Sequence, residues 1–343
     1  MRILVSTPTF LPEVGGLEIL TAHLAARFAA LGHSVRLVTR TTTPDPRDAS
    51  FPYEIVRRPS PWRMLALAWW AEVHLQSQLN LTFGWPHLVL RRPLIMAHQN
   101  WTPRVGVRGY LKHWLMRLGP NIACSSAIAG SLPIRAAVIG NPYADEVFPL
   151  VPFGGQREKD ILFVGRLVED KGAADLVSAL QILREQGFSF TASFIGGGGE
   201  RARLERQVAD AGLSEAVDFL GERSPTEASR AMQNHRILVV PSRWEEPFGI
   251  VALEGIASGC IVLVTEAGGL PDAGGACAVK VPKADPAALA AHLATALCSS
   301  VATVDDETRR THLQRHTVAA VANKYLEVMS RGIRAADRSS GIN

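Results

Sequence analysis

The chain has 343 residues, which is too long for one ordinary α/β core and suits two domains of roughly 150 residues each. Hydrophobic residues make up 47% and charged residues 20%, which excludes an intrinsically disordered chain. Lys and Arg outnumber Asp and Glu by 15 to 8 over residues 1–150, whereas the remainder is acidic, with 21 against 24. The basic half predicts an anionic partner, such as a phosphorylated acceptor or a membrane surface.

The N-terminal half alternates short apolar runs with amphipathic segments, which is typical of parallel sheets covered by helices. The first residues carry one arginine and an apolar core too short for a secretory signal, and they predict a buried strand at 3–6. Apolar residues then recur at helical spacing from Leu17 to Leu31, and Gly32 ends that helix. Residues 41–63 fit no element. Further strands are expected at 35–38, 94–97, 121–125 and 137–139.

A cluster of proline and glycine predicts the linker between the domains: Pro142, Pro149, Pro152, Gly154 and Gly155. A second α/β series follows it. Its strands are expected at 161–164, 191–195, 237–240, 261–264 and 278–281, and its helices at about 172–186, 200–211, 225–234 and 249–258. The predicted domains are 1–150 and 151–305. Residues 306–333 are expected to form helices that pack back on the first domain, and 334–343 a disordered tail.

Targeting and metal signals are weak. No apolar run reaches the roughly 18 residues of a membrane span. None of the four cysteines forms a CxxC pair, so no zinc site is predicted, and Cys124 and Cys260 are expected as buried thiols. We therefore expect a cytoplasmic protein, with peripheral contact at the inner face of the membrane as an open alternative.

Two segments of the second domain carry candidate chemistry. Residues 245–254 follow a predicted strand and lead into a helix whose free N–H groups suit a phosphate, with Glu246 before the helix and Glu254 inside it. A solvated helix with one incidental acid explains the spacing equally well. Arg166 and Lys171 follow the first strand of this domain and suit a pyrophosphate, although two exposed loop cations are a common arrangement.

Together with four further motifs, these segments make the chain resemble the retaining glycosyltransferases of family 4, the glycosyl transferases group 1. The motifs fall in the family's order: Gly15-Gly16 with Glu18, Gly165-Arg166-Leu167 with Lys171-Gly172, residues 194–198, residues 217–221, residues 246–254 and residues 268–272. The resemblance implies the GT-B fold, an α/β architecture of two Rossmann-like domains with parallel sheets that face each other across a cleft.

The resemblance also implies a role for each matching residue. Arg166 and Lys171 should grip the donor phosphates, Glu246 should contact the transferred sugar, and His98 should lie near it. The donor-binding residues implied are Gly15, Gly16, Gly165, Phe219, Phe248, Gly249, Ile250, Val251 and Glu254. Glu254 is expected at the ribose hydroxyls and Phe219 at the uracil or guanine. A histidine after an apolar strand is otherwise often a satisfied core residue, and His74, His87 and His113 are interpreted in that way.

The activity implied is transfer of a hexose-type sugar from a UDP- or GDP-linked donor to a saccharide or lipid-linked acceptor, with no cofactor and no required metal. The alternatives are synthesis of a soluble glycoside and a non-catalytic nucleotide-sugar-binding subunit. Residues 80–85 and 141–143 and Asp272 depart from the family pattern, and the first two leave the acceptor open. Residues 57–70 and 104–117 combine cations with aromatic residues, which favours either an anionic membrane or amphipathic helices packed on the core. No nucleic-acid partner is expected.

Overall fold

The computed structural model describes residues 1–13, 15–90, 92–103, 105–153, 157–298 and 304–340. The chain forms two compact units, Met1–Pro142 with Val318–Asn343, and Tyr143–Thr317. The sequence placed this boundary at residue 150 instead of 142. Gly154 and Gly155 of the predicted linker and Arg104 of the basic segment lie outside the described residues.

Unit 1 is built on a seven-stranded parallel sheet in the order β3-β2-β1-β4-β5-β6-β7. Its strands are β1 (Arg2–Thr7), β2 (Ser34–Thr39), β3 (Glu54–Arg57), β4 (Val73–Gln76), β5 (Leu94–His98), β6 (Asn121–Ala123) and β7 (Ala137–Val138). Its helices are α1 (Gly16–Ala30), α2 (Pro61–Trp70), α3 (Leu81–Gly84), α4 (Gly106–Leu115), α5 (Ser126–Ser131) and α13 (Val318–Ser340), with short 3-10 turns at Asp48–Ser50, Trp85–Leu88 and Met116–Leu118.

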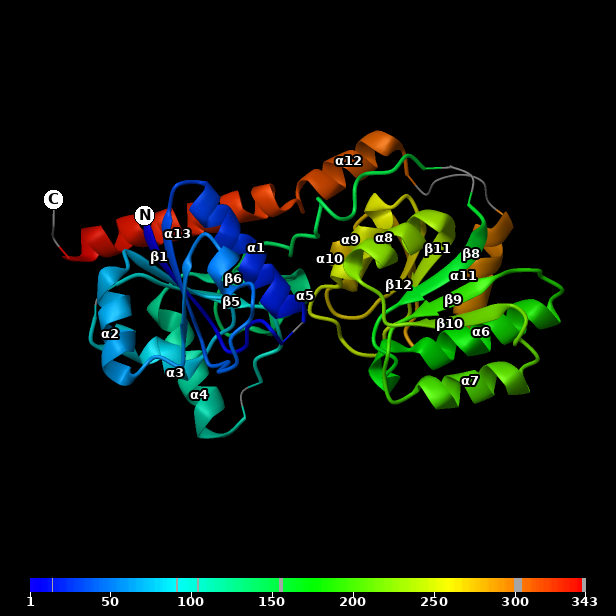
Figure 1. Cartoon of the computed structure of the whole chain (residues 1–343), viewed down its shortest axis with the longest axis horizontal. Helices are drawn as coiled ribbons and strands as arrows, with labels where there is room; N and C mark the ends of the chain where they lie inside the picture. Colours follow the sequence, from blue (N-terminus) through cyan, green and yellow to red (C-terminus); the bar gives the residue numbers. More distant parts are fainter. Residues whose placement is uncertain (14, 91, 104, 154–156, 299–303, 341–343) are drawn as a thin grey trace. The chain divides into compact units, whose positions relative to one another are not determined.

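Helices cover both faces of the unit 1 sheet, and the last helix of the chain covers one of them. α1 and α13 share a buried core on one face, to which α13 contributes Val321, Ala322, Tyr325 and Met329 (Figure 1). α2 packs Met64 and its neighbours on the other face. α13 is helical to Ser340, so residues 334–340 form a helix where the sequence predicted a disordered tail. The hydrophobic seam along this helix explains the extension, because burial at its core holds the following turns.

Unit 2 has a six-stranded parallel sheet in the order β10-β9-β8-β11-β12-β13. Its strands are β8 (Lys159–Val164), β9 (Ala192–Ile195), β10 (Val217–Gly221), β11 (His235–Val240), β12 (Ile261–Thr265) and β13 (Ala278–Val281). Its helices are α6 (Ala173–Glu185), α7 (Arg201–Asp210), α8 (Pro225–Asn234), α9 (Ile250–Ala257), α10 (Leu270–Gly274), α11 (Pro286–Cys298) and α12 (Asp306–Gln314), with a 3-10 turn at Glu169–Lys171.

Both sheets reverse their strand order once, and this reversal positions the candidate sites. In unit 1 the order changes direction between β1 and β4, and in unit 2 between β8 and β11. In open parallel sheets, ligands bind outside the carboxyl ends of the strands at such a switch point. The sites are therefore expected where β1, β4, β8 and β11 end.

Several elements were absent from the predicted strands and helices. β3 lies within residues 41–63, α2 begins there at Pro61, and β4, α5, α10 and α11 were not anticipated. β4 is buried throughout although it contains His74 and Gln76, because these side chains hydrogen-bond inside the fold instead of meeting water. None of the helices in the described ranges has the length and hydropathy of a membrane span.

Candidate functional site

The switch point of unit 2 brings two loops together. The first leaves β8 at Val164 and runs through Arg166 to Lys171, and the second leaves β11 at Val240 and runs through Glu246 to Gly249. β8 and β11 pair directly, so the two loops emerge side by side at the carboxyl edge. This placement unites four residues that the sequence predicted from separate motifs: Arg166, Lys171, Glu246 and Glu254.

Lys171 and Glu246 form the ionic centre of this edge. The Lys171 ammonium donates to Glu246 Oε1, and the Ser242 hydroxyl donates to the same oxygen over 2.7 Å. Glu246 is 9% exposed. A nearly buried carboxylate needs such partners because an unpaired charge there would be costly. The pair holds both side chains at the crevice where a ligand would bind.

Arg166 differs from Lys171 because its cation is not committed to an acid. The residue is exposed, and among the described residues no carboxylate forms an ion pair with its guanidinium. A planar guanidinium in this state can accept a phosphate in a bidentate geometry. Among the described residues, this edge thus offers Arg166 as a cation without an acidic partner beside the paired Lys171.

The glycine run 196–198 supports the Arg166 loop. Gly196 and Gly198 have φ of +139° and +152°, and a Cβ on either would collide with the carbonyl oxygens of Gly165 and Leu167. The Leu167 amide donates to Gly197 O over 2.7 Å. The run is therefore a close backbone contact that holds the Arg166 loop, and not only a flexible turn.

Glu254 lies on α9. Its carboxyl forms no hydrogen bond or ion pair with any other described residue. Burial raises the pKa of Glu254 to about 7. A shielded carboxyl with free oxygens suits two hydroxyl groups of a ligand, since these would supply the missing hydrogen bonds.

The first turn of α9 adds backbone donors. Gly249 precedes the helix with φ of +102°, and a Cβ there would collide with Leu270. The amides of Ile250 and Val251 occupy the first turn, where an α-helix supplies no acceptor for them. These amides suit an anion, as the sequence predicted.

Two predicted donor residues are accounted for by packing. The Phe219 ring stacks on Phe194 at 5.0 Å between centroids and joins the hydrophobic core beneath α6. Phe248 is 2% exposed and contacts the His316 ring at 5.5 Å. A role for either in donor binding stays a prediction.

Arg243 and Asp175 form a clamp that sequence inspection missed. Arg243 Nε donates to Asp175 Oδ2 over 2.7 Å, and its terminal nitrogen donates to Asp175 Oδ1. The amides of Arg243 and Trp244 both donate to Asp170 O, at 2.8 and 3.0 Å. The β11–α9 loop is thereby fastened to the loop that carries Lys171. Only a charged residue three positions after β11 hinted at this, and its partner lies 68 positions away.

Glu245 fastens the same loop from its other side. Its carboxylate accepts from the Gly268 amide over 2.6 Å and from the Lys283 ammonium. Lys283 and the Gly268 amide hold the pKa of Glu245 below its usual value. The motif at 268–272 therefore supports the site through Glu245 and through Gly269, whose amide donates to Glu246 O over 2.7 Å.

Unit 1 places His98 at the carboxyl end of β5, wholly buried. Asn121 donates through Nδ2 to Met116 O and Gly119 O, at 2.7 and 2.8 Å, so its Oδ1 faces His98 Nε2 over 2.9 Å. Nε2 must then carry the proton, which leaves His98 Nδ1 as a buried acceptor with no partner in the part of the chain that the structure describes. Burial lowers the pKa of His98 and favours this neutral form.

The glycines of unit 1 lie where α1 begins. Gly15 precedes the helix and a Cβ there would meet Glu18 Oε2 at 2.6 Å, while Gly16 opens onto free space. Glu18 is buried and accepts from the Thr9 hydroxyl. The approach to the start of α1 is thus clear of side chains at Gly16.

His74 and His87 fit their interpretation as satisfied core residues. His74 joins Ser6 Oγ and His87, each over 2.8 Å, and both histidines have pKa values lowered mainly by burial. His113 fits it only in part, because its Nε2 lies 3.0 Å from Thr102 O but its buried Nδ1 has no partner among the described residues. In the described parts of the chain, no three His, Cys, Asp or Glu side chains gather as metal ligands.

Unit 2 matches a known protein family. Residues 154–311 match the family model of the Glycosyl transferases group 1. The chain carries a domain of this family. The match covers the two loops, the glycine run and α9, so the predicted family is confirmed on the unit that holds these motifs.

Curated relatives share the same region. The chain is 33% identical over 152 residues to glycogen synthase of Mycobacterium tuberculosis, and the aligned region covers 43% of this chain and 36% of that protein. It is 37% identical over 145 residues to D-inositol 3-phosphate glycosyltransferase of Corynebacterium jeikeium, which covers 40% and 34%. These matches span about a third of the relatives' length.

Solved structures resemble the whole chain. Anabaena Alr3699/HepE in complex with UDP has a TM-score of 0.81 at 19% identity and covers 96% of this chain and 100% of its own. A glycosyltransferase from Rickettsia africae has a TM-score of 0.80 at 16% identity, covering 97% and 99%. At these identities the likeness shows the fold, and it confirms the predicted GT-B class.

Proposed function

We propose that the protein is a retaining glycosyltransferase that transfers a hexose-type sugar from a UDP- or GDP-linked donor to a saccharide or lipid-linked acceptor. The observation that carries this proposal is the group at the switch point of unit 2. Within the described ranges, it combines a cation without an acidic partner, an acid–base pair and a partly buried carboxyl without a hydrogen-bond partner, at Arg166, Lys171–Glu246 and Glu254. A nucleoside diphosphate sugar presents the complementary phosphates and hydroxyls.

In this proposal the donor is held by polar groups on both loops. Arg166 and Lys171 bind the pyrophosphate and stabilise the charge that develops as the glycosidic bond breaks. The amides of Ile250 and Val251 contact the same phosphates, with Gly165 and Gly249 allowing close approach. Glu254 accepts from the ribose hydroxyls, and the base lies by Phe219. UDP is the first nucleotide to test, since HepE was solved with UDP and with UDP-glucose.

The transferred sugar is assigned to Glu246 and, from unit 1, to His98, whose free Nδ1 can accept from a sugar hydroxyl. Gly15 and Gly16 are assigned to the phosphates. The leaving phosphate takes the proton of the acceptor hydroxyl on the face it leaves, so the anomeric configuration is retained. The proposal places the protein in the cytoplasm, with contact to an anionic membrane and no nucleic-acid partner.

The test is thermal stabilisation by UDP, GDP, ADP and TDP, because a ligand that binds only the native state raises the melting temperature. We expect one nucleotide to stabilise the wild type and not Arg166→Ala. Arg230→Ala, which removes an exposed cation from α8, is the matched control and should respond like the wild type.

Transfer itself is measured by release of the nucleotide from its sugar conjugate with acceptor present. Stabilisation without release on any acceptor would favour a non-catalytic nucleotide-sugar-binding subunit. Release with small soluble acceptors alone would favour synthesis of a soluble glycoside. Stabilisation by no nucleotide would contradict the proposal at the level of the donor site.

A further inference from the structure

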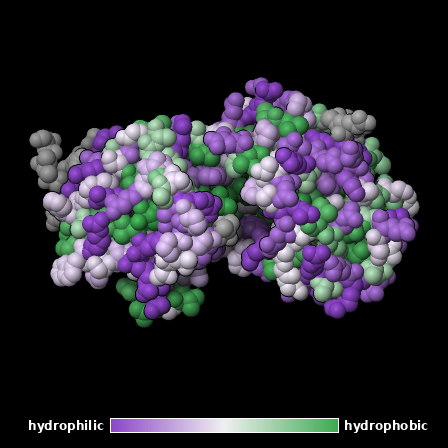
Figure 2. Space-filling model, in the orientation of Figure 1, coloured by the Kyte–Doolittle hydropathy of each residue, from purple (hydrophilic) through white to green (hydrophobic). Residues whose placement is uncertain are grey.

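Helix α4 of unit 1 turns its apolar side to solvent. Val107, Tyr110, Leu111, Trp114 and Leu118 recur at helical spacing along α4 and the turn after it, and each is between 42 and 76% exposed. Figure 2 shows hydrophobic residues gathered at the end of unit 1 where Figure 1 draws α4. An amphipathic helix normally buries such a stripe, whereas no described residue of unit 1 covers this one.

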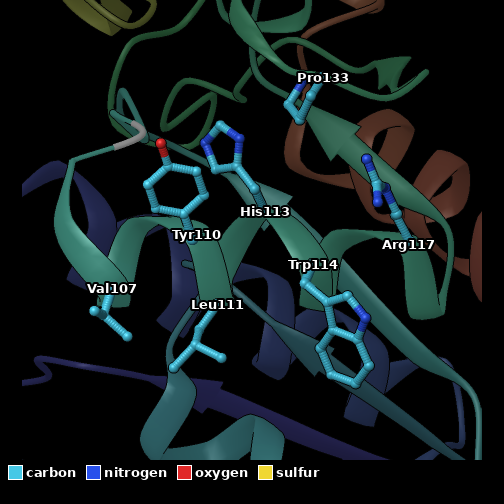
Figure 3. Close-up of a pocket in the computed structure, with 7 residues that line it drawn as sticks. All are labelled: Val107, Tyr110, Leu111, His113, Trp114, Arg117 and Pro133. Atoms are coloured by element: carbon cyan, nitrogen blue, oxygen red, sulfur yellow. The ribbon is translucent and has the colours of Figure 1, made fainter.

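The side chains of α4 also border a hollow. Tyr110, His113, Trp114 and Arg117 line it together with Pro133, and its volume is about 350 Å³. Figure 3 shows Val107, Leu111 and Trp114 along one side of the helix. Tryptophan and tyrosine combine an apolar ring with one polar group, which suits a boundary between water and hydrocarbon.

Cations without acids surround this surface. Residues 73–144 contain seven Lys and Arg and no Asp or Glu. Arg108, Lys112 and Arg117 lie among the exposed apolar residues, and none forms an ion pair within the described ranges. Over the whole of unit 1 the formal charge is +11, whereas unit 2 carries −7. The surface therefore attracts an anionic occupant and repels a second copy of itself.

The other aromatic segment of unit 1 differs in this respect. Trp62 and Trp69 of α2 are 81 and 67% exposed, but the neighbouring Arg63 pairs with Glu54 over 3.0 Å. Glu54 also pairs with Arg36, over 2.7 Å. The exposed rings of α2 thus lie beside cations that mostly have acidic partners, and Arg58 is the cation of that segment without an ion pair among the described residues. The α4 segment has three such cations, Arg108, Lys112 and Arg117, and no nearby acid in the sequence.

We infer that α4, with Val105 and Leu118 at its ends, is a docking surface for an anionic lipid bilayer. Trp114, Leu111 and Val107 enter the interface, and Arg108, Lys112 and Arg117 bind lipid phosphates. Docking by α4 deepens the proposed function, because it names the element that meets a membrane carrying a lipid-linked acceptor. Only the purpose of the docking rests on that function; the binding to lipid does not.

The experiment is flotation of the full chain with vesicles. We use phosphatidylcholine alone and phosphatidylcholine with about 30 mol% phosphatidylglycerol, at about 50 and about 300 mM NaCl. We expect binding to the anionic vesicles, weakened at high salt. A basic residue near a bilayer contributes roughly fivefold to binding, so R108Q/K112Q/R117Q should bind about a hundredfold more weakly.

A second variant tests the apolar stripe, V107S/L111S/W114S, and should also lose binding. W62S/W69S is the matched control, since it removes two exposed tryptophans of the same unit, and it should bind like the wild type. All substituted positions of these two variants are exposed, so folding is expected to persist. Circular dichroism and nucleotide-induced stabilisation check this in each variant.

Several outcomes would overturn the inference. These are equal binding to neutral vesicles, no binding at low salt, unchanged binding by both α4 variants, or loss of binding in W62S/W69S alone. A wild-type dimer that either α4 variant converts to a monomer would assign the surface to a second copy. Vesicle binding requires no nucleotide, so its failure and the failure of donor binding are read from separate measurements.

Discussion

Glu254 supports a prediction in which donor binding and stability change in opposite directions. Its pKa of about 7 lies above the ordinary value of 4.5 because burial disfavours the carboxylate. Between these pH values the folded protein keeps a proton that the unfolded chain releases. The free energy of unfolding of the wild type therefore falls as pH rises through this window, and the loss is complete above about pH 7.

The size of this loss follows from the shift. Each pKa unit corresponds to about 1.4 kcal/mol, so the full window amounts to about 3 kcal/mol. This is an upper limit, since Glu254 keeps partial solvent access. Glu254→Gln has no carboxyl to ionise. The free energy of unfolding of the variant minus that of the wild type should therefore be up to about 3 kcal/mol larger at about pH 8 than at about pH 5.

The measurement is urea unfolding followed by circular dichroism at both pH values, with nucleotide-induced stabilisation in parallel. Glu215→Gln, at an exposed loop position of the same unit, is the control and should leave both quantities unchanged. Glu254→Gln should become more stable at the higher pH and bind the donor nucleotide at least tenfold more weakly, since an amide oxygen is a weaker acceptor for hydroxyls. A stability difference that is the same at both pH values would refute the burial argument. Undiminished nucleotide binding would refute the role in the donor site.

Three further predictions concern the same unit. Gly172→Ala should destabilise the protein by about 2 kcal/mol or more, because φ is +68° and a Cβ would collide with Pro241 O. Gly187→Ala, with φ of +85° and free space around the Cβ, should cost about 1 kcal/mol. Thermal unfolding compares the two variants, and equal losses of stability would contradict the collision. Arg243→Gln should raise the KM for the donor more than it lowers kcat, because the clamp to Asp175 positions the loop of Lys171 without touching the reacting atoms. A change in melting temperature with unchanged kinetics would reduce the clamp to a structural role. EDTA should leave turnover intact, and recovery only on adding Mg²⁺ or Mn²⁺ would show that a metal is required.

Much of the fold could be predicted from local patterns. Apolar runs of β-branched residues and helical spacing marked all six strands of unit 2 but one, β10, which was recognised only as the motif at 217–221. β3 and β4 escaped for physical reasons. β3 lies at the edge of the sheet and is only partly buried, so its alternation is weak. β4 buries His74 and Gln76, whose hydrogen-bond partners come from a residue distant in the chain or from the following loop.

The candidate site divides in a similar way. Arg166, Lys171, Glu246 and Glu254 could be named in advance because each belongs to a short motif at a strand end, and strand ends of a parallel sheet share one edge. Which of these side chains pair with one another could not be predicted from the sequence. The contact of Lys171 with Glu246 joins residues 75 positions apart, and it exists only because β8 and β11 are neighbours.

The sequence by itself determined the family, the α/β class and the residue types available for phosphates and hydroxyls, since these depend on periodicity and on motifs read locally. Only the tertiary structure decided which of those residues are paired and which remain free. In the described chain Glu246 is neutralised by Lys171, Glu254 is partly buried without a partner, and α4 leaves its apolar stripe uncovered within unit 1. Charge pairing and burial depend on which distant segments meet, and that is a property of the folded chain alone.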